Sequence, residues 1–277
     1  MTTCYFVSDL HGNKHKYELL VREIARNKPP FLFLGGDLLP LVRVSDKRYN
    51  NTENPFIREF MIPLFQKLQK QLGCNYPEVY LISGNDDYKV DMPGFKLGAE
   101  KELWKFLNSE KVKFGPYNIY GYSYVPPTPF RIKDWEKYDI DFTISPGCLK
   151  PEDGFKSVPL QPGDNNIIKD DLEALVGNDQ LDKAIFIMHS PPFASLLDQI
   201  SGNISIGSKA IAQFIEDKQP YITLHGHVHE TSTISGNWRQ VFNRTHSFSA
   251  AFEGEGLCIV IFQIDNPAMA ERKIIEI

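Results

Sequence analysis

Metal-binding side chains follow five short apolar runs of the sequence, each close to the point where the run ends. The runs cover residues 4–8, 31–34, 79–83, 184–188 and 221–224. The side chains that follow them are Asp9, His11, Asp37, Asn85, His189, His227 and His229. Runs of this length and composition predict buried strands. Because the carboxyl ends of parallel strands line one crevice in an open α/β sheet, we expect these side chains to meet there.

The donor groups of these residues are four imidazoles, two carboxylates and one amide. Such a mixture of nitrogen and oxygen suits Mn²⁺, Fe or Zn²⁺ better than Ca²⁺ or a zinc site built from thiolates. Asp9 and His11 are two residues apart, as are His227 and His229. On an extended backbone both members of each pair point to the same side, so each pair is expected to reach one ion. We expect the other three histidines to be ordinary core or surface residues: His15, His225 and His246.

Seven ligands are too many for one tetrahedral ion and suit two ions that share a carboxylate. Asp37 is the natural bridge because it stands alone at the end of its run. Two ions about 3.5 to 4 Å apart can hold a hydroxide between them and stabilise the attacking and leaving oxygens of a displacement at phosphorus. The pattern predicts a dinuclear metal-dependent phosphoester hydrolase with a metal-bridging hydroxide as nucleophile.

Five blocks of the sequence, in order, resemble the calcineurin-like metallophosphoesterases. The blocks are Asp9-Leu10-His11, Gly36-Asp37, Gly84-Asn85, His189 alone and Gly226-His227-Val228-His229. The resemblance covers residues 9–229 and implies an α/β fold, a four-layer α/β/β/α sandwich of two mixed sheets flanked by helices. The ligands that it implies for the first metal ion are Asp9, His11, Asp37 and His229. Those that it implies for the second are Asp37, Asn85, His189 and His227.

The block around Asn85 departs from the family pattern. Most hydrolytic members follow Gly-Asn with a histidine that donates a proton to the leaving group, whereas this sequence has Asp86 and Asp87. An ordinary Asp has a pKa of about 3.9, so Asp86 can donate a proton near neutral pH only if burial or a neighbouring carboxylate raises that pKa. Three roles stay open for Asp86: catalytic acid or substrate contact, support for a metal ligand, or a structural role. For Asp87 we expect capping or solvation.

The missing histidine changes the expected activity. Diesters with good leaving groups depend less on proton donation, so we expect a phosphodiesterase rather than a monoesterase. Protein serine/threonine phosphatases carry Asp-Arg-Gly shortly after the second block, where this sequence has Leu38-Leu39-Pro40, and they are disfavoured. The alternative hypothesis is a catalytically weak or inactive scaffold of the same fold for protein partners. A nuclease shares the ligand set, but the acidic charge balance disfavours it.

Apolar residues spaced three and four apart predict the helices between these strands. The helices cover residues 14–27, 55–72, 100–109 and 208–217. After His229, short alternating segments separated by Gly and Asn predict antiparallel strands over 231–235, 238–243, 257–264 and 272–277. We interpret residues 1–277 as a single domain.

Residues 124–168 hold seven of the 19 prolines and show no clear period, which predicts an irregular insertion rather than a domain. Two hypotheses stay open for this insertion and the adjoining residues 117–124. In the first they form a rim or lid around the organic part of a substrate, with Arg131 or Lys133 on a phosphate. In the second they form a strand followed by an ordinary surface loop.

Charge and composition argue against several classes of protein. The 277 residues carry a formal net charge of -5 and no dense run of Lys or Arg, so there is no strong nucleic-acid signal. No apolar stretch approaches the roughly 20 residues that cross a bilayer, and the start of the chain lacks a secretion signal. The four cysteines are far apart and predict reduced thiols. We expect a cytoplasmic protein that acts on a phosphorylated small molecule or a nucleotide-like substrate.

Overall fold

Strands that are apolar throughout must be buried on both faces, because successive side chains point to opposite sides. The computed structural model describes residues 2–41 and 53–276. In its strand β1 (Thr3–Val7), Tyr5 and Val7 pack against helices, whereas Cys4 and Phe6 face a second sheet. The apolar runs therefore form the inner layers of the fold.

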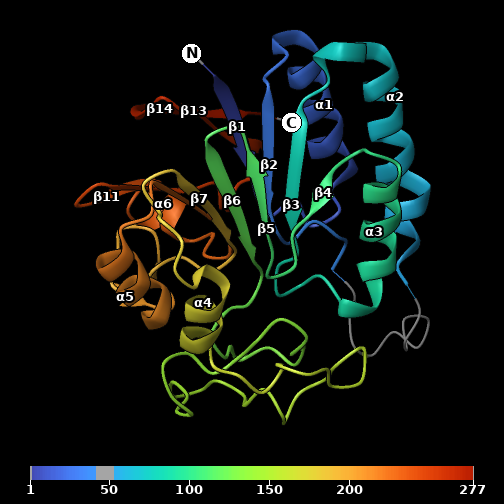
Figure 1. Ribbon diagram of the computed structural model, residues 1–277. Coiled ribbons are helices and arrows are strands. Elements are labelled where there is room, and N and C mark those ends of the chain that lie inside the picture. Colours follow the sequence, from blue (N-terminus) through green and yellow to red (C-terminus); the bar gives the residue numbers. More distant parts are fainter. Residues whose placement is uncertain (1, 42–52, 277) are drawn as a thin grey trace.

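Two six-stranded sheets pack face to face (Figure 1). In spatial order the first contains β14 (Asn266–Ile275), β13 (Leu257–Gln263), β1, β2 (Phe31–Gly35), β3 (Glu78–Ile82) and β4 (Lys105–Phe106). The second contains β11 (Arg239–Phe242), β12 (Thr245–Ser249), β10 (Ile222–His225), β7 (Ala184–Met188), β6 (Tyr117–Tyr122) and β5 (Lys111–Phe114). Each sheet has a parallel centre and antiparallel pairs toward an edge, so both are mixed. A separate short hairpin consists of β8 (Gln199–Ile200) and β9 (Ile204–Ser205).

Helices cover the outer face of each sheet (Figure 1). The first sheet is covered by α1 (Lys14–Asn27), α2 (Ile62–Leu72) and α3 (Met92–Glu100). The second is covered by α4 (Ile168–Val176) and α5 (Lys209–Lys218). The predicted four-layer α/β/β/α sandwich is confirmed. None of the helices in the described part of the chain combines the length and the apolar character needed to span a bilayer.

The five predicted strands and the helices predicted over 14–27 and 208–217 form close to their expected bounds. The helix predicted over 55–72 contains a π-helical segment, Ile57–Met61, that continues into α2. The helix predicted over 100–109 is wrong, because α3 ends at Glu100 and β4 pairs with β3. Trp104 turns back over α3 and donates its ring N–H to the Phe95 carbonyl at 2.8 Å. Strand pairing and this contact override the helical spacing of the segment.

The strand predicted over 231–235 is also wrong, since these residues form the helical turn α6 (Thr231–Ile234). The Ser232 hydroxyl donates to the His229 carbonyl at 2.8 Å, and the Thr233 hydroxyl donates to the Glu230 carbonyl at 3.0 Å. Such local bonds compete with strand formation. The strand predicted over 272–277 starts earlier, as part of β14, and Ile277 lies outside the described residues.

The chain between β6 and α4 runs irregularly beyond the ends of the parallel strands (Figure 1). It has buried polar contacts of its own: Lys133 and Glu136 form an ion pair at 2.5 Å, and both side chains are fully buried. Lys133 is therefore not free to meet a phosphate, as the rim hypothesis allowed, whereas Arg131 is exposed. Residues 117–122 form β6 inside the second sheet, as the strand hypothesis stated.

Candidate metal centre

The loops that carry the predicted ligands leave β1, β2, β3, β7 and β10 at their carboxyl ends. Backbone hydrogen bonds join these loops to one another. The Asp9 N–H donates to the Gly36 carbonyl at 3.0 Å, and the His11 N–H donates to the Asp37 carbonyl at 2.8 Å. The Gly226 N–H donates to the His189 carbonyl at 3.0 Å. The loops thus form one connected unit rather than independent turns.

Four of the predicted ligands adopt the left-handed backbone conformation that non-glycine residues usually avoid. Their φ angles are 58° at Asp9, 43° at His11, 52° at Asp37 and 72° at His227. The expectation that each ligand pair projects from an extended backbone is therefore wrong. Tight turns bring the side chains together instead, and such turns persist because the surrounding structure holds them.

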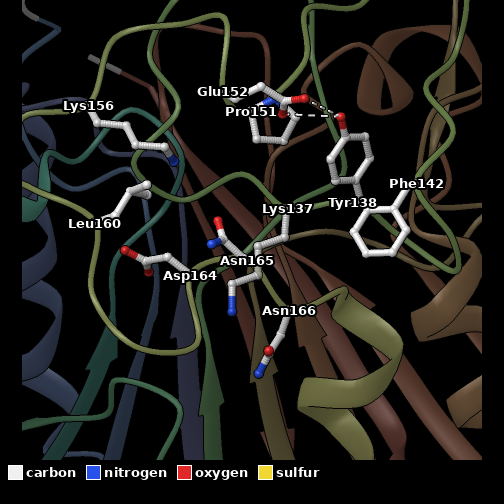
Figure 2. A pocket seen from close by; sticks show the side chains of 10 residues that line it. All are labelled: Lys137, Tyr138, Phe142, Pro151, Glu152, Lys156, Leu160, Asp164, Asn165 and Asn166. Atoms are coloured by element: carbon white, nitrogen blue, oxygen red, sulfur yellow. Dashed lines mark hydrogen bonds between the residues drawn. The ribbon is translucent and has the colours of Figure 1, made fainter.

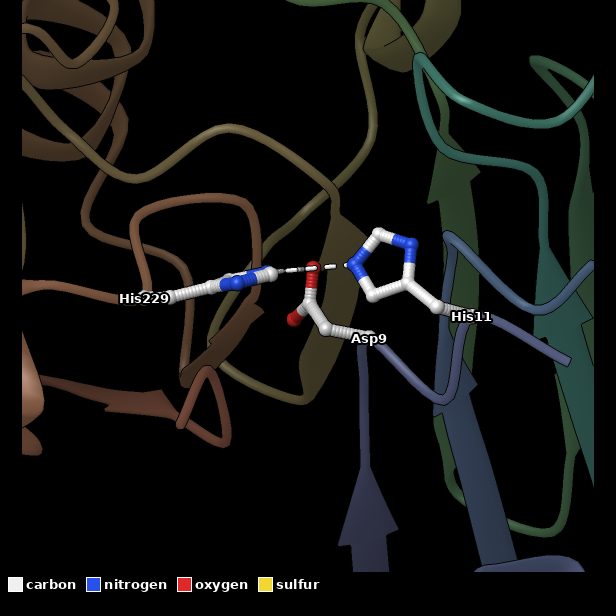
Figure 3. A group of neighbouring side chains, drawn as sticks. All are labelled: Asp9, His11 and His229. Carbon is white, nitrogen blue, oxygen red and sulfur yellow. Dashed lines mark hydrogen bonds and ion pairs between the residues drawn. The ribbon is translucent and has the colours of Figure 1, made fainter. Parts of the chain in front are cut away.

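Asp9, His11 and His229 form the first group of potential ligands, with donor atoms within 4.8 Å of one another. Figure 3 shows the three side chains pointing toward a common centre. His229 Nε2 lies 3.1 Å from Asp9 Oδ1 and 3.4 Å from His11 Nε2. Asp9 and His11 share one loop, and His229 follows more than 200 residues later in the chain. Carboxylate oxygens and deprotonated imidazole nitrogens are donors that suit a metal ion.

Asp37, His189 and His227 form the second group, again with donor atoms within 4.8 Å of one another. His189 Nε2 lies 3.2 Å from Asp37 Oδ2 and 3.1 Å from Asn85 Oδ1. The other ring nitrogen of His189, Nδ1, lies 2.8 Å from the Gly35 carbonyl, to which it can donate a proton. A hydrogen bond of this kind selects the tautomer whose Nε2 is free to bind a metal.

Asp37 lies between the two groups. Its carboxylate belongs to the second group and is also within 4.8 Å of donor atoms of His11 and Asp86. Asp37 is therefore close to a member of each group, which is the position that a bridging ligand needs. The structure brings all seven predicted ligands to this region.

Asp86 forms hydrogen bonds with two of the predicted ligands, Asp37 and Asn85. Its backbone N–H donates to Asp37 Oδ1 at 2.8 Å, and Asn85 Nδ2 donates to Asp86 Oδ1 at 3.2 Å. The second of these hydrogen bonds fixes the amide nitrogen of Asn85, so that its amide oxygen lies toward His189. Burial and the nearby Asp37 carboxylate raise the pKa of Asp86 to about 8.

Asp87 is fully buried and accepts backbone N–H groups from Leu38 at 3.0 Å, Leu39 at 2.8 Å and Gly84 at 2.9 Å. Asp87 caps none of the described helices and is not solvated, so neither expectation is confirmed. These bonds join the loop after β2, which carries Asp37, to the loop after β3, which carries Asn85. Sequence reasoning had no signal for this connection, because its donors are backbone groups of another loop.

His225 is a core residue, as expected. Its Nδ1 lies 2.8 Å from the Ser190 carbonyl and its Nε2 lies 2.8 Å from the Thr223 hydroxyl. Burial lowers its pKa to about 4, so the ring is neutral at physiological pH. Both ring nitrogens are engaged, and neither is available to a metal ion.

The charge balance of the centre favours cations. Of the described residues, only histidines form ion pairs with Asp9 and Asp37. Burial by itself disfavours a charged ring, but Asp37 outweighs it at His189 and raises the pKa to about 10. Asp9 likewise outweighs burial at His229 and raises its pKa to about 9. Two buried carboxylates surrounded by nitrogen donors fit a pair of divalent ions, which would replace these two imidazolium charges.

Metal uptake at pH 7 is expected to release about two protons per chain. His189 and His229 have raised pKa values and are protonated at that pH in the metal-free protein, whereas a ligating imidazole is neutral. The metal affinity should therefore rise with pH until the pH exceeds the pKa values of both rings. Calorimetric titration with Zn²⁺ in two buffers of different ionisation enthalpy measures the release, and heats that do not depend on the buffer would contradict it.

Gly84→Ala is expected to lower metal affinity by about 10- to 100-fold. A Cβ atom at residue 84 would lie 2.2 Å from Asp37 Oδ1 and 2.6 Å from His189 Cε1, so both ligands must move. Gly98→Ala is the matched control, because its Cβ would lie 1.9 Å from Trp104 Cζ2, away from the centre. The control should lose thermal stability and retain its metal. Equal metal content in both variants would refute the assignment of Asp37 and His189 as ligands.

A model of the family described as calcineurin-like phosphoesterase matches residues 2–231. No curated protein matches the chain. Among solved structures, the protein TT1561 of Thermus thermophilus is similar, with 12% identity, a TM-score of 0.63 and 99% of both chains covered. A putative 5′-nucleotidase from Staphylococcus aureus has 12% identity and a TM-score of 0.52, covering 99% of this chain and 53% of that one. At these identities the likeness shows a shared fold.

Proposed function

The chain belongs to the calcineurin-like phosphoesterases, and from that membership we propose that it hydrolyses phosphoesters with two divalent metal ions. The observation that supports this most is the convergence of two ligand groups, with Asp37 near both. We assign one ion to Asp9, His11, Asp37 and His229. We assign the other to Asp37, Asn85, His189 and His227. Mn²⁺, Fe and Zn²⁺ suit this donor set.

When bound, two such ions generate hydroxide from water near neutral pH and stabilise charge on the oxygens of the reacting phosphorus. The protein positions the ligands for this chemistry. The Gly35 carbonyl orients His189, Asp86 orients the Asn85 amide, and Asp87 holds two of the ligand loops together. Positioning of this kind removes the need to reorganise the site during the reaction.

We propose that diesters are preferred over monoesters, because Asp86 stands where hydrolytic relatives carry a histidine acid. The test uses bis(4-nitrophenyl) phosphate and 4-nitrophenyl phosphate with Mn²⁺, since the two share a leaving group. We expect the higher kcat/KM for the diester, and faster monoester turnover would reverse the proposed preference. If the purified protein holds less than one equivalent of tightly bound metal and shows no turnover, the alternative is favoured, a scaffold for protein partners.

Asp86 is proposed as the proton donor to the leaving group. Asp86→Asn removes the proton and should lower turnover of a phenyl ester by about 100-fold, with a smaller loss for a nitrophenyl ester. Asp86→His should restore turnover of the phenyl ester relative to Asp86→Asn, because an imidazole can again donate a proton near neutral pH. Equal losses for both leaving groups in Asp86→Asn, without a recovery in Asp86→His, would show that Asp86 only supports Asn85.

We also propose that residues 1–277 form one domain that acts in the cytoplasm on a phosphorylated small molecule. Apolar side chains from both sheets share one core, which supports the single domain. The four cysteines, Cys4, Cys74, Cys148 and Cys258, are unpaired, which supports a reducing compartment.

A further inference from the structure

A cavity of about 360 Å³ lies within the segment between β6 and α4 (Figure 2). This segment lies at the end of the molecule where the parallel strands finish, which is the end that carries the metal ligands (Figure 1). The volume falls within the range of small-molecule pockets. Its walls include Tyr138, Phe142, Lys156, Leu160 and Asn165.

The loop that carries Asn85 is bonded to the segment that forms this cavity. Lys89 Nζ lies 2.6 Å from Asp164 Oδ1 on the cavity wall, and the Lys89 N–H donates to Asp134 at 2.8 Å. The next N–H along the chain, that of Val90, donates to the Ser157 hydroxyl at 3.0 Å. Lys89 is four residues after Asn85, and four extended residues span at most about 14 Å. The Lys89 backbone therefore lies within about 14 Å of Asn85. Its side chain reaches Asp164 on the cavity wall.

One positive charge in the cavity has no carboxylate partner. Lys137 is paired with Asp171 at 2.5 Å, and Asp164 is paired with Lys89. Lys156 Nζ donates to the Lys133 carbonyl at 2.8 Å, and no described carboxylate lies within ion-pair distance of it. An ammonium group carries three N–H donors, so Lys156 has two left for a ligand. Burial and the Lys89 ammonium lower the pKa of Lys156, and together they outweigh the opposite effect of the more distant carboxylates of Asp164, Asp134 and Glu136.

Apolar side chains stand at the mouth of the same cavity. Phe142 is 71% exposed and Leu160 is 55% exposed, although both line it. The Tyr138 and Phe142 rings meet at 66° with centroids 5.3 Å apart, and the Tyr138 hydroxyl donates to Glu152 at 2.9 Å. Exposed aromatic surface beside a cavity is typical of a site that covers a flat ligand.

We infer that this cavity binds the organic group of the phosphoester substrate, and that this group joins a planar apolar ring to an anionic oxygen such as a carboxylate. The ring lies against Phe142 and Leu160, and the oxygen accepts hydrogen bonds from Lys156. The inference rests on the proposed function, because the phosphoester itself is placed at the metal centre.

Two diesters with the same 4-nitrophenyl leaving group test the inference. Their second ester group is phenyl in one and 4-carboxyphenyl in the other. We expect kcat/KM to be at least about tenfold higher for the carboxyphenyl diester, since a charge-assisted hydrogen bond is worth that factor or more. Lys156→Met should bring the ratio to about one. Lys150→Met is the matched control, because Lys150 is exposed in the same segment but does not line the cavity, and its ratio should match the wild type.

Binding to the metal-free protein separates this inference from the proposed function. In ligand-observed NMR, benzoate should bind the wild type and lose binding in Lys156→Met, whereas Lys150→Met should bind it like the wild type. If Lys156 controls benzoate binding but neither diester is hydrolysed, the proposed function fails and the site stands. If both diesters are hydrolysed and Lys156→Met changes neither their ratio nor benzoate binding, the inference is overturned.

Discussion

Asp37→Asn is expected to lower kcat/KM for bis(4-nitrophenyl) phosphate by at least about 100-fold. The Asp37 carboxylate lies 3.2 Å from His189 Nε2 and within 4.8 Å of a donor atom of His11. An amide keeps the size of this side chain but removes its negative charge. Two cations close together repel each other, so a neutral bridge cannot hold both.

Metal content distinguishes this explanation from a loss of folding. Asp37→Asn should retain at most one ion per chain at saturating Mn²⁺, whereas the wild type should hold two. Asp198→Asn is the matched control, because Asp198 is a buried loop carboxylate that accepts N–H groups of Ala194, Ser195 and Gly207 outside the metal centre. The control should lose stability but keep two ions. Two ions and wild-type rates in Asp37→Asn would defeat the bridging role.

Asp87→Ala is expected to lower the free energy of unfolding by about 3 kcal/mol or more. Asp87 accepts three buried backbone N–H groups, and each donor left without a partner costs about 1 to 3 kcal/mol. The same bonds connect the loops that carry Asp37 and Asn85. We therefore expect kcat/KM for the diester to fall as well, by about 100-fold.

Urea unfolding in the presence of a chelator measures this stability without a contribution from bound metal. Asp153→Ala serves as the control, because Asp153 is an exposed side chain in the segment between β6 and α4, and its removal should change the unfolding free energy by less than about 0.5 kcal/mol. A loss of activity in Asp87→Ala with unchanged stability would mean that Asp87 acts on the substrate and not on the loops.

The four-layer fold could be predicted because its signals are local. Each apolar run predicts a strand that is buried on both faces, and each predicted ligand follows shortly after such a run in the sequence. The order of these blocks carries the family resemblance, which needs no knowledge of tertiary contacts. The helix over 14–27 was predictable for the same reason, since its apolar spacing and its observed bounds agree.

Contacts with distant parts of the chain determined the secondary structure and turn geometry that the local sequence did not predict. Lys105 and Phe106 form a strand because Tyr80 and Leu81 of β3 lie beside them, although their own spacing favours a helix. Turn geometry at Asp9, with its φ of 58°, depends on the neighbouring loop that receives its backbone hydrogen bond. No pattern of residue types within either segment encodes that neighbour.

The sequence by itself determined which residues are candidate metal ligands and that they follow strands, because both properties depend on residue type and local order. Only the tertiary structure decided that Asp87 joins the two loops that carry Asp37 and Asn85, and that Lys133 is buried in an ion pair. The same is true of Lys156, which lines a cavity and has no described carboxylate within ion-pair distance. The reason is physical. The charge state and partners of a buried polar group depend on its surroundings, and those surroundings come from elements far away along the chain.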